Sequence, residues 1–221
     1  MKSILFATAT AITAALATIP AAAGAQTAAH AAAAPQGSAS KLVLDSSTRI
    51  LTTLDKRRAE FRGNPAALKT YVSSEFDRLF DRDYAARLVL GLHGRGASDA
   101  DVKLFADALT DNLLARYGTA LLDFDGQLKV RIKSETPLPG GRGVKVSSEF
   151  LRSNGQPVPV DYLMRDNGGQ WKLFDVMIEG ISYVQTFKNQ FDAPLRSKTI
   201  AQVAADLRAG RLQAGDNANA D

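Results

Sequence analysis

The stretch that decides the fold is Trp171-Lys-Leu-Phe-Asp-Val-Met-Ile-Glu-Gly-Ile-Ser-Tyr-Val-Gln-Thr-Phe-Lys-Asn-Gln-Phe191. Its first eight residues are mostly apolar and rich in types that favour strands, and Glu179-Gly180 breaks the run. From Ser182 onward, apolar residues return at steps of three and four, which indicates a helix. The stretch therefore predicts a last strand that leads directly into a helix, across a glycine that can take a positive φ.

Upstream of this stretch, three segments alternate apolar and charged or polar residues with the period of a strand. These segments are Leu128–Ile132, Val144–Phe150 and Val158–Met164, and the turn residues between the strands are Pro139-Gly-Gly141, Asn154-Gly155 and Asn167-Gly-Gly169. Together with the Trp171 segment they predict a four-stranded antiparallel meander with one apolar and one charged face.

The remainder of the folded region has helical periodicity. Helices are predicted over Asp45–Arg62, from Pro65 to Phe80, from Asp83 to Leu92 and from Ser98 to Leu121, then over Ser182–Leu195 and Thr199–Ala209. Helices that precede and follow a meander predict an α+β domain with helices laid across one face of the sheet.

The N-terminal segment predicts export, and both ends of the chain predict segments outside the folded domain. Residues 1–25 have the layout of a cleaved signal peptide: a basic start, an apolar run from Ile4 to Ile19 and small residues at Ala23-Gly-Ala25. Residues 26–40 predict a disordered linker, residues 41–209 a single domain, and residues 210–221 a disordered tail. The chain has no cysteine, which excludes disulfides, thiol nucleophiles and cysteine-bound metals, and we expect the mature protein to be soluble.

The charge pattern argues against nucleic acid as a partner. The chain carries 27 Lys and Arg against 23 Asp and Glu, a net charge of +4. The basic residues are scattered, apart from Lys56-Arg57-Arg58, and form no stripe interleaved with aromatic residues. A mild positive charge favours instead an acidic partner or anionic lipid headgroups.

Catalytic patterns are sparse. His93 is the only histidine in the predicted domain, too few for a His-based metal site, and no phosphate-binding loop follows a strand. Asp175 and Glu179 form the one carboxylate pair near the central joint. General acid–base work is one interpretation of this pair, and capping or tethering of the adjacent loop is the favoured one.

The sequence from Trp171 to Ser182, followed by Asn189-Gln190-Phe191, resembles the signature of the MlaC family, also called toluene-tolerance proteins. Further matches are Leu90-Gly91, Phe105, Tyr117-Gly118 and the strand with Tyr162, and the likeness runs in order from about Leu44 to Leu207. One departure is His93-Gly94, where family members often carry an aromatic-tryptophan pair.

The resemblance implies a curved sheet with helices over its concave face, similar to an NTF2-like cone, that encloses an apolar cavity for the acyl chains of a phospholipid. It implies a periplasmic carrier without cofactor or metal, and not an enzyme. The residues expected to contact lipid are Tyr84, Leu88, Leu92, Phe105, Leu109, Leu113, Tyr117, Val144, Val146, Val160, Tyr162, Met164, Leu173 and Val184.

The resemblance also implies partners and leaves alternatives. The expected partners are phospholipid, an inner-membrane lipid-transport ABC complex and an outer-membrane lipoprotein–porin complex, and the protein is expected to be a monomer. The alternatives are a small periplasmic enzyme that uses Asp175 with Tyr84 or Tyr162, and a structural adaptor with a solid core. If the middle strands line the cavity, Val146→Arg should give a folded protein without lipid, whereas a solid core predicts unfolding.

Overall fold

The computed structural model of the protein describes residues 38–123, 128–152 and 155–215. These residues belong to one compact unit. The predicted signal peptide, residues 26–37 of the predicted linker and residues 216–221 of the predicted tail lie outside the described residues. Within the described part of the chain, no helix is both long enough and apolar enough to cross a membrane.

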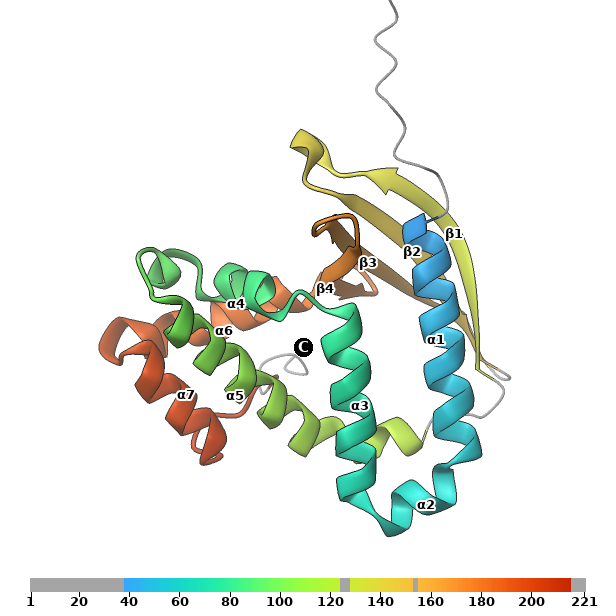
Figure 1. Cartoon of the computed structure of the whole chain (residues 1–221), viewed down its shortest axis with the longest axis horizontal. Coiled ribbons are helices and arrows are strands. Elements are labelled where there is room, and N and C mark those ends of the chain that lie inside the picture. Colours follow the sequence, from blue (N-terminus) through green and yellow to red (C-terminus); the bar gives the residue numbers. More distant parts are fainter. Residues whose placement is uncertain (1–37, 124–127, 153–154, 216–221) are drawn as a thin grey trace, which may run out of the picture. The chain divides into compact units, whose positions relative to one another are not determined.

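The described residues form seven α-helices and one five-stranded sheet, which confirms the predicted α+β class (Figure 1). The helices are α1 (Ser38–Lys56), α2 (Arg58–Gly63), α3 (Pro65–Leu79), α4 (Arg82–Leu90), α5 (Asp99–Tyr117), α6 (Tyr183–Ser197) and α7 (Ile200–Arg208). The 3₁₀ turns are η1 (Gly91–Gly94), η2 (Thr119–Leu122) and η3 (Pro139–Gly141), and the strands are β1 (Lys129–Pro137), β2 (Val144–Leu151), β3 (Val158–Asp166), β4 (Trp171–Ile178) and β5 (Ile181–Ser182).

The sheet is an antiparallel meander in the order β1-β2-β3-β4-β5. Four of these strands match the predicted segments, and β5 is an additional short strand that pairs Ile181 with Ile178. The two residues between them, Glu179 and Gly180, both have positive φ angles of 51° and 84°. This is the backbone of a two-residue hairpin turn, so the predicted glycine joint is a hairpin followed at once by α6.

A β-bulge in the pairing of β3 with β4 sets the direction of the β4 side chains. Met164 pairs with Leu173 and Leu163 pairs with Asp175, so Phe174 is an extra residue between two register positions. The bulge keeps Leu173 and Val176 on the same face of the sheet, although they are three residues apart. Asp175 lies on the opposite face, where α6 begins.

Helix α1 begins earlier than the sequence predicted. Residues 38–40, predicted as linker, are helical, and the segment predicted as one helix over Asp45–Arg62 is divided into α1 and α2 at Arg57. Glu135 on β1 accepts hydrogen bonds from the Ser40 backbone N–H (2.9 Å) and hydroxyl (2.6 Å). A carboxylate of the sheet thus satisfies a donor in the first turn of α1, a long-range contact that no local pattern contains.

The other helix starts follow local capping chemistry. The side chains of Asn64, Asp81, Ser98 and Thr199 each accept a hydrogen bond from a backbone N–H three residues further along. The predicted starts at Asn64-Pro65 and Ser98 are confirmed, because these caps depend only on neighbouring residues.

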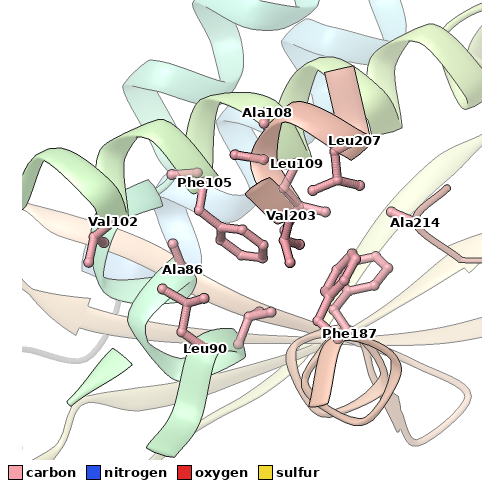
Figure 2. Close-up of a cluster of buried hydrophobic side chains, with 14 of the residues drawn as sticks. Ala86, Leu90, Val102, Phe105, Ala108, Leu109, Phe187, Val203, Leu207 and Ala214 are labelled. Carbon is pink, nitrogen blue, oxygen red and sulfur yellow. The ribbon is translucent and has the colours of Figure 1, made fainter. Parts of the chain in front are cut away.

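Three apolar cores hold the described elements together: one under the sheet, one between the helices, and a third around Leu54 and Phe61. In the first, α1 lies across β1 and β2 (Figure 1), and its Ala39 and Val43 pack with Val144, Val146 and Met164. In the second, α4, α5, α6 and α7 pack around Phe105 and Phe191, whose rings meet edge to face at 5.5 Å. Figure 2 shows this second core, with side chains from all four helices converging.

Candidate ligand-binding cavity

A cavity of about 570 Å³ lies between α3, α4, α5, α6 and β4. This volume is typical of small-molecule sites, which range from about 300 to 1,000 Å³. The cavity lies next to the helical core and shares a wall with it. Helices α4, α5 and α6 each turn one face to that core and another to the cavity.

The α3 and α4 wall is made of aromatic and aliphatic side chains. Phe76 and Phe80 stack with their ring centroids 4.1 Å apart, and Ala85 and Val89 continue the surface along α4. Phe80 ends α3 in an extended conformation, where it forms a bridge to Leu173 of the sheet. The stacked rings are therefore fixed against the sheet at one end of the cavity.

The α5 and α6 wall is also apolar. Leu109 and Leu113 contribute from α5, and Val184 and Phe187 contribute from α6. Phe187 also belongs to the helical core, where it lies 6.4 Å from Phe191 between ring centroids (Figure 2 shows its direction). The same aromatic side chain thus seals the inner end of the cavity against the core.

The sheet closes the cavity through β4 alone. Val176 and Ile178 lie on the sheet face that also carries Val160 and Tyr162, their partners on β3. Phe174, the residue at the bulge, also lines the cavity and meets the ring of Tyr84 edge to face at 5.3 Å. The residue at the bulge therefore adds one aromatic side chain to the β4 wall of the cavity.

The polar groups that line the cavity are engaged with protein partners. Arg82 donates to Asp77 and to Asp107, each at 2.6 Å, so it links α3, α4 and α5. The Thr110 hydroxyl donates to the Ala106 carbonyl at 2.8 Å. A ligand in this cavity therefore meets an apolar surface whose few polar groups already have hydrogen bonds.

Asp175 is 5% exposed and holds the start of α6. Its carboxylate accepts hydrogen bonds from the Ser182 hydroxyl (2.6 Å) and the Val184 backbone N–H (3.0 Å). Burial raises the pKa of the Asp175 carboxyl above its ordinary value, against the opposing effect of these hydrogen bonds. The geometry is that of a helix-capping carboxylate, which is the favoured interpretation of this residue from the sequence.

The carboxylate and tyrosines that an enzyme would need do not come together. Glu179 is exposed at the hairpin turn and does not pair with Asp175. Tyr162 pairs with Val176 on the face of the sheet opposite to Asp175, and burial raises the pKa of its hydroxyl while hydrogen bonds with Ser47 and Ser148 oppose that rise. The ring of Tyr84 lies instead between Phe174 and the guanidinium of Arg165, 4.2 Å from its centroid.

The mouth of the cavity has an apolar rim. Tyr117, Leu121 and Tyr183 line the cavity and are 37%, 38% and 37% exposed. Ile181 of the β4–β5 hairpin, two residues before Tyr183, is also exposed but does not line the cavity. Three of the six large apolar side chains that are exposed in the described part of the chain therefore line this opening.

The structure brings four of the predicted site residues to the cavity: Leu109, Leu113, Tyr117 and Val184. Contact of these four with a ligand stays a prediction. The structure places the other ten away from the cavity lining: Tyr84, Leu88, Leu92, Phe105, Val144, Val146, Val160, Tyr162, Met164 and Leu173.

The physical reason for this difference is what covers the sheet. Val144, Val146 and Met164 share one face, as predicted from the strand period, and are at most 2% exposed. Helix α1 packs directly on that part of the face, so these residues form a solid core instead of a cavity wall. The cavity begins only further along the face, at Val176 and Ile178.

Two more of the residues predicted to contact lipid, Phe105 and Leu92, point away from the cavity. Phe105 points into the helical core and is fully buried. Leu92 points to solvent, because η1 turns the chain away at the end of α4. The neighbouring His93, at the departure from the resembled pattern, pairs with Asp192 of α6 at 2.9 Å.

Several lining residues were not predicted: Phe76, Phe80, Ala85, Val89, Phe174, Val176, Ile178 and Phe187. The spacing of Phe76 and Phe80, one helical turn apart, marks an apolar side of α3 but not what that side faces. No sequence pattern indicated that Phe174 lines the cavity. The alternation of a regular strand places it on the face opposite to Leu173, and the bulge at this position changes that alternation.

The fold and the cavity define a class of protein: an α+β domain whose sheet and helices enclose an apolar cavity for a hydrophobic ligand. Residues 45–209 match the sequence model of the MlaC protein family, and the chain belongs to that family.

Two known proteins illustrate the relationship. The chain is 26% identical over 182 residues to the toluene tolerance protein Ttg2D of Pseudomonas putida, a match that covers 80% of this chain and 84% of that protein. Its fold is similar to that of a phospholipid-binding protein from Ralstonia solanacearum, solved in complex with a phospholipid. That match has a TM-score of 0.68 at 22% identity and covers 78% of this chain and 97% of the other.

Proposed function

We propose that this protein is a soluble periplasmic carrier that binds the acyl chains of a phospholipid in its cavity and leaves the headgroup in water. The observation that carries the proposal is the apolar lining of a cavity of about 570 Å³, whose few polar groups already have protein partners. The MlaC family and the phospholipid held by the similar Ralstonia solanacearum protein support the choice of ligand.

Energetics explain why a lipid needs a carrier. At about 0.8 kcal/mol per methylene, an acyl chain of some fifteen methylenes costs roughly 12 kcal/mol to bring into water. A cavity as apolar as the bilayer interior removes most of this cost, so that uptake and release are both accessible. The rim of Tyr117, Leu121 and Tyr183 provides an apolar path for the chain at the mouth.

The proposed route runs between the outer and inner membranes, in a system that maintains the lipid asymmetry of the outer membrane. The proposed partners are an outer-membrane lipoprotein–porin complex and an inner-membrane lipid-transport ABC complex, with the carrier acting as a monomer exported by its signal peptide. Carriage requires no chemical turnover, and Asp175 is proposed to act as a cap of α6, not as a catalytic base.

Extraction of the purified protein tests this proposal. Protein purified from a bacterial periplasm without detergent should carry a diacyl phospholipid, because acyl chains are far more stable in an apolar cavity than in water. Native mass spectrometry of the protein and lipid analysis of a solvent extract should agree on the added mass. Protein that is consistently empty after gentle purification would contradict the carrier function.

A further inference from the structure

The most exposed large apolar side chain in the described part of the chain is not at the cavity. Leu92, in the η1 turn between α4 and α5, is 68% exposed, compared with 37–57% for the other exposed large apolar residues. The turn between α4 and α5 lies at the end of the helical layer, away from the sheet (Figure 1). Leu92 does not line the cavity. An isolated exposed leucine is ordinary, so its setting decides whether it has a role.

The turn that carries Leu92 is held in place from several sides. Gly91 has a φ of 55°, and a Cβ atom at this position would lie 2.9 Å from the side chain of Lys188 on α6. His93 pairs with Asp192 of α6 at 2.9 Å, and the Arg95 backbone N–H donates to the Leu92 carbonyl at 3.2 Å. The backbone therefore presents Leu92 to solvent in a fixed position instead of letting it fold back onto the core.

Both basic and acidic side chains lie on the elements around this turn. Arg87 pairs with Asp99 beside the turn, and Arg196 pairs with Asp192 at 2.6 Å. Arg95 and Lys188 are exposed and have no carboxylate partner among the residues that the structure describes. The turn is thus an apolar tip with two cations whose charge is not neutralised by a neighbouring carboxylate.

We propose that the η1 turn is a membrane-docking tip, in which Leu92 enters the headgroup layer of an anionic phospholipid bilayer while Arg95 and Lys188 contact lipid phosphates. A protein partner would need about 800 Å² of contact per side with an apolar centre. One leucine among charged side chains does not provide such a centre. Binding to a headgroup layer requires only an inserted apolar side chain and nearby cations. Each cation strengthens binding about fivefold.

The tip adjoins two helices of the cavity wall, whereas the mouth at Tyr117 lies at the opposite end of α5 from the η1 turn. Two parts of the chain contribute to both places. Val89 of α4 lines the cavity and Leu92 follows in the η1 turn, and α6 provides Phe187 to the cavity and Lys188 to the tip. Docking of the tip would therefore hold the two helices that form a cavity wall close to the membrane. The reason for visiting a membrane rests on the proposed carrier function, but the tip itself lies outside the cavity.

Co-sedimentation with vesicles tests the tip. The full mature protein should bind vesicles that contain about one third phosphatidylglycerol in phosphatidylethanolamine more tightly than vesicles of phosphatidylcholine alone, and salt should weaken this binding. Leu92→Ser should weaken binding to the anionic vesicles about tenfold. The double variant Arg95→Gln and Lys188→Gln should weaken it about 25-fold, since each lost charge is worth about fivefold.

Matched controls separate the tip from general effects. Leu44→Ser removes another exposed leucine, on α1, and Lys129→Gln removes an exposed cation on β1; both should bind vesicles as the unchanged protein does. Unchanged circular dichroism and unchanged bound lipid in the Leu92→Ser protein would show that fold and cavity are intact. Under those conditions, lost vesicle binding is assigned to the tip.

Two outcomes would overturn the proposal. If the unchanged protein does not bind anionic vesicles, the tip is not a membrane contact, and an acidic protein surface becomes its partner. If Leu92→Ser and the charge variant bind as tightly as the controls do, vesicle binding uses another surface. A protein that carries no lipid but binds anionic vesicles through the tip would contradict the carrier function and support the docking tip. The failure of one proposal is therefore distinguishable from the failure of the other.

Discussion

Val146 and Leu113 are both apolar and both face the space between sheet and helices, but they have different surroundings. Val146 on β2 is fully buried between the sheet and α1. Leu113 on α5 is half-buried and lines the cavity near Tyr117 at its mouth. A charge introduced at the two positions therefore meets different conditions, because only the second has a route to water.

Replacing each residue by arginine should separate these surroundings. Val146→Arg should unfold the protein, with a loss of more than about 4 kcal/mol in the free energy of unfolding, because the charge is buried without a partner. Leu113→Arg should remain folded, since its long side chain can extend to the mouth, but should carry no lipid. Urea denaturation and lipid analysis of both purified variants measure the two outcomes.

This expectation for Val146→Arg reverses the one drawn from the strand period alone. A folded, lipid-free Val146→Arg protein would show that α1 leaves the sheet to make room for ligand. Unfolding of Leu113→Arg, by contrast, would place this residue in a solid core. The period of the strand predicts which face is buried, but the identity of the covering element depends on contacts between distant segments.

At the scale of elements, the segment after α7 is more than a tail. Residues 210–215, predicted as disordered, pack against α5 and α6, and Ala214 is fully buried. Asn112 of α5 donates to the Leu207 and Leu212 carbonyls at 2.8 and 3.1 Å and accepts from the Ala214 backbone N–H at 2.9 Å. Gly215 then lines the cavity, so the segment closes one side of it.

Asn112→Ala should therefore loosen this wall. Loss of three hydrogen bonds to the backbone should lower the free energy of unfolding by about 2–3 kcal/mol. Amide hydrogen exchange should rise in residues 207–215 more than elsewhere, and bound lipid should be released to acceptor vesicles faster. The control is Asn189→Ala, an exposed residue of α6 whose side chain accepts a local hydrogen bond from Gln185 at 2.8 Å. Equal lipid release from the two variants would contradict a role for the segment in closing the cavity.

The elements that the sequence predicted well are those determined by neighbours. Asn64-Pro65 and Ser98 begin helices as predicted, and the residues on β2 and β3 alternate as predicted. The start of α1 at Ser38 and the buried Ala214 were missed, because Ala- and Gly-rich segments carry no periodic signal of their own. Their order comes from Glu135 and Asn112, which are distant in sequence.

The cavity is a property of the whole molecule. Its walls come from α3, α4, α5, α6 and β4, with Leu121 and Gly215 added from the segments after α5 and α7. It exists because α1 packs mainly on β1 and β2, whereas Val176 and Ile178 of β4 face the space between the sheet and the other helices. Hydrophobic periodicity can predict each apolar face but not the distance between two of them. Four of the residues predicted to contact lipid, on α5 and α6, line the cavity, whereas the predicted sheet residues do not line it and the sheet residues that do are on β4.

For a molecule built around an open apolar cavity, removal of the ligand should weaken the fold. A ligand that binds only the folded state stabilises it by about 2.7 kcal/mol at a free concentration one hundred times its Kd. For a domain of this size, that corresponds to about 5–10 °C in Tm. Protein stripped of lipid by refolding on a hydrophobic resin should therefore melt lower than the purified protein, and added phospholipid should restore the Tm.

The Leu113→Arg variant provides the control for this measurement, because its charge lies in the cavity while the rest of the surface is unchanged. Its Tm should not respond to added phospholipid. If lipid raised the Tm of both proteins equally, the effect would come from the surface and not from the cavity. If lipid left the Tm of the stripped protein unchanged, the cavity would not be a lipid site, because binding to the folded state alone must shift the unfolding equilibrium.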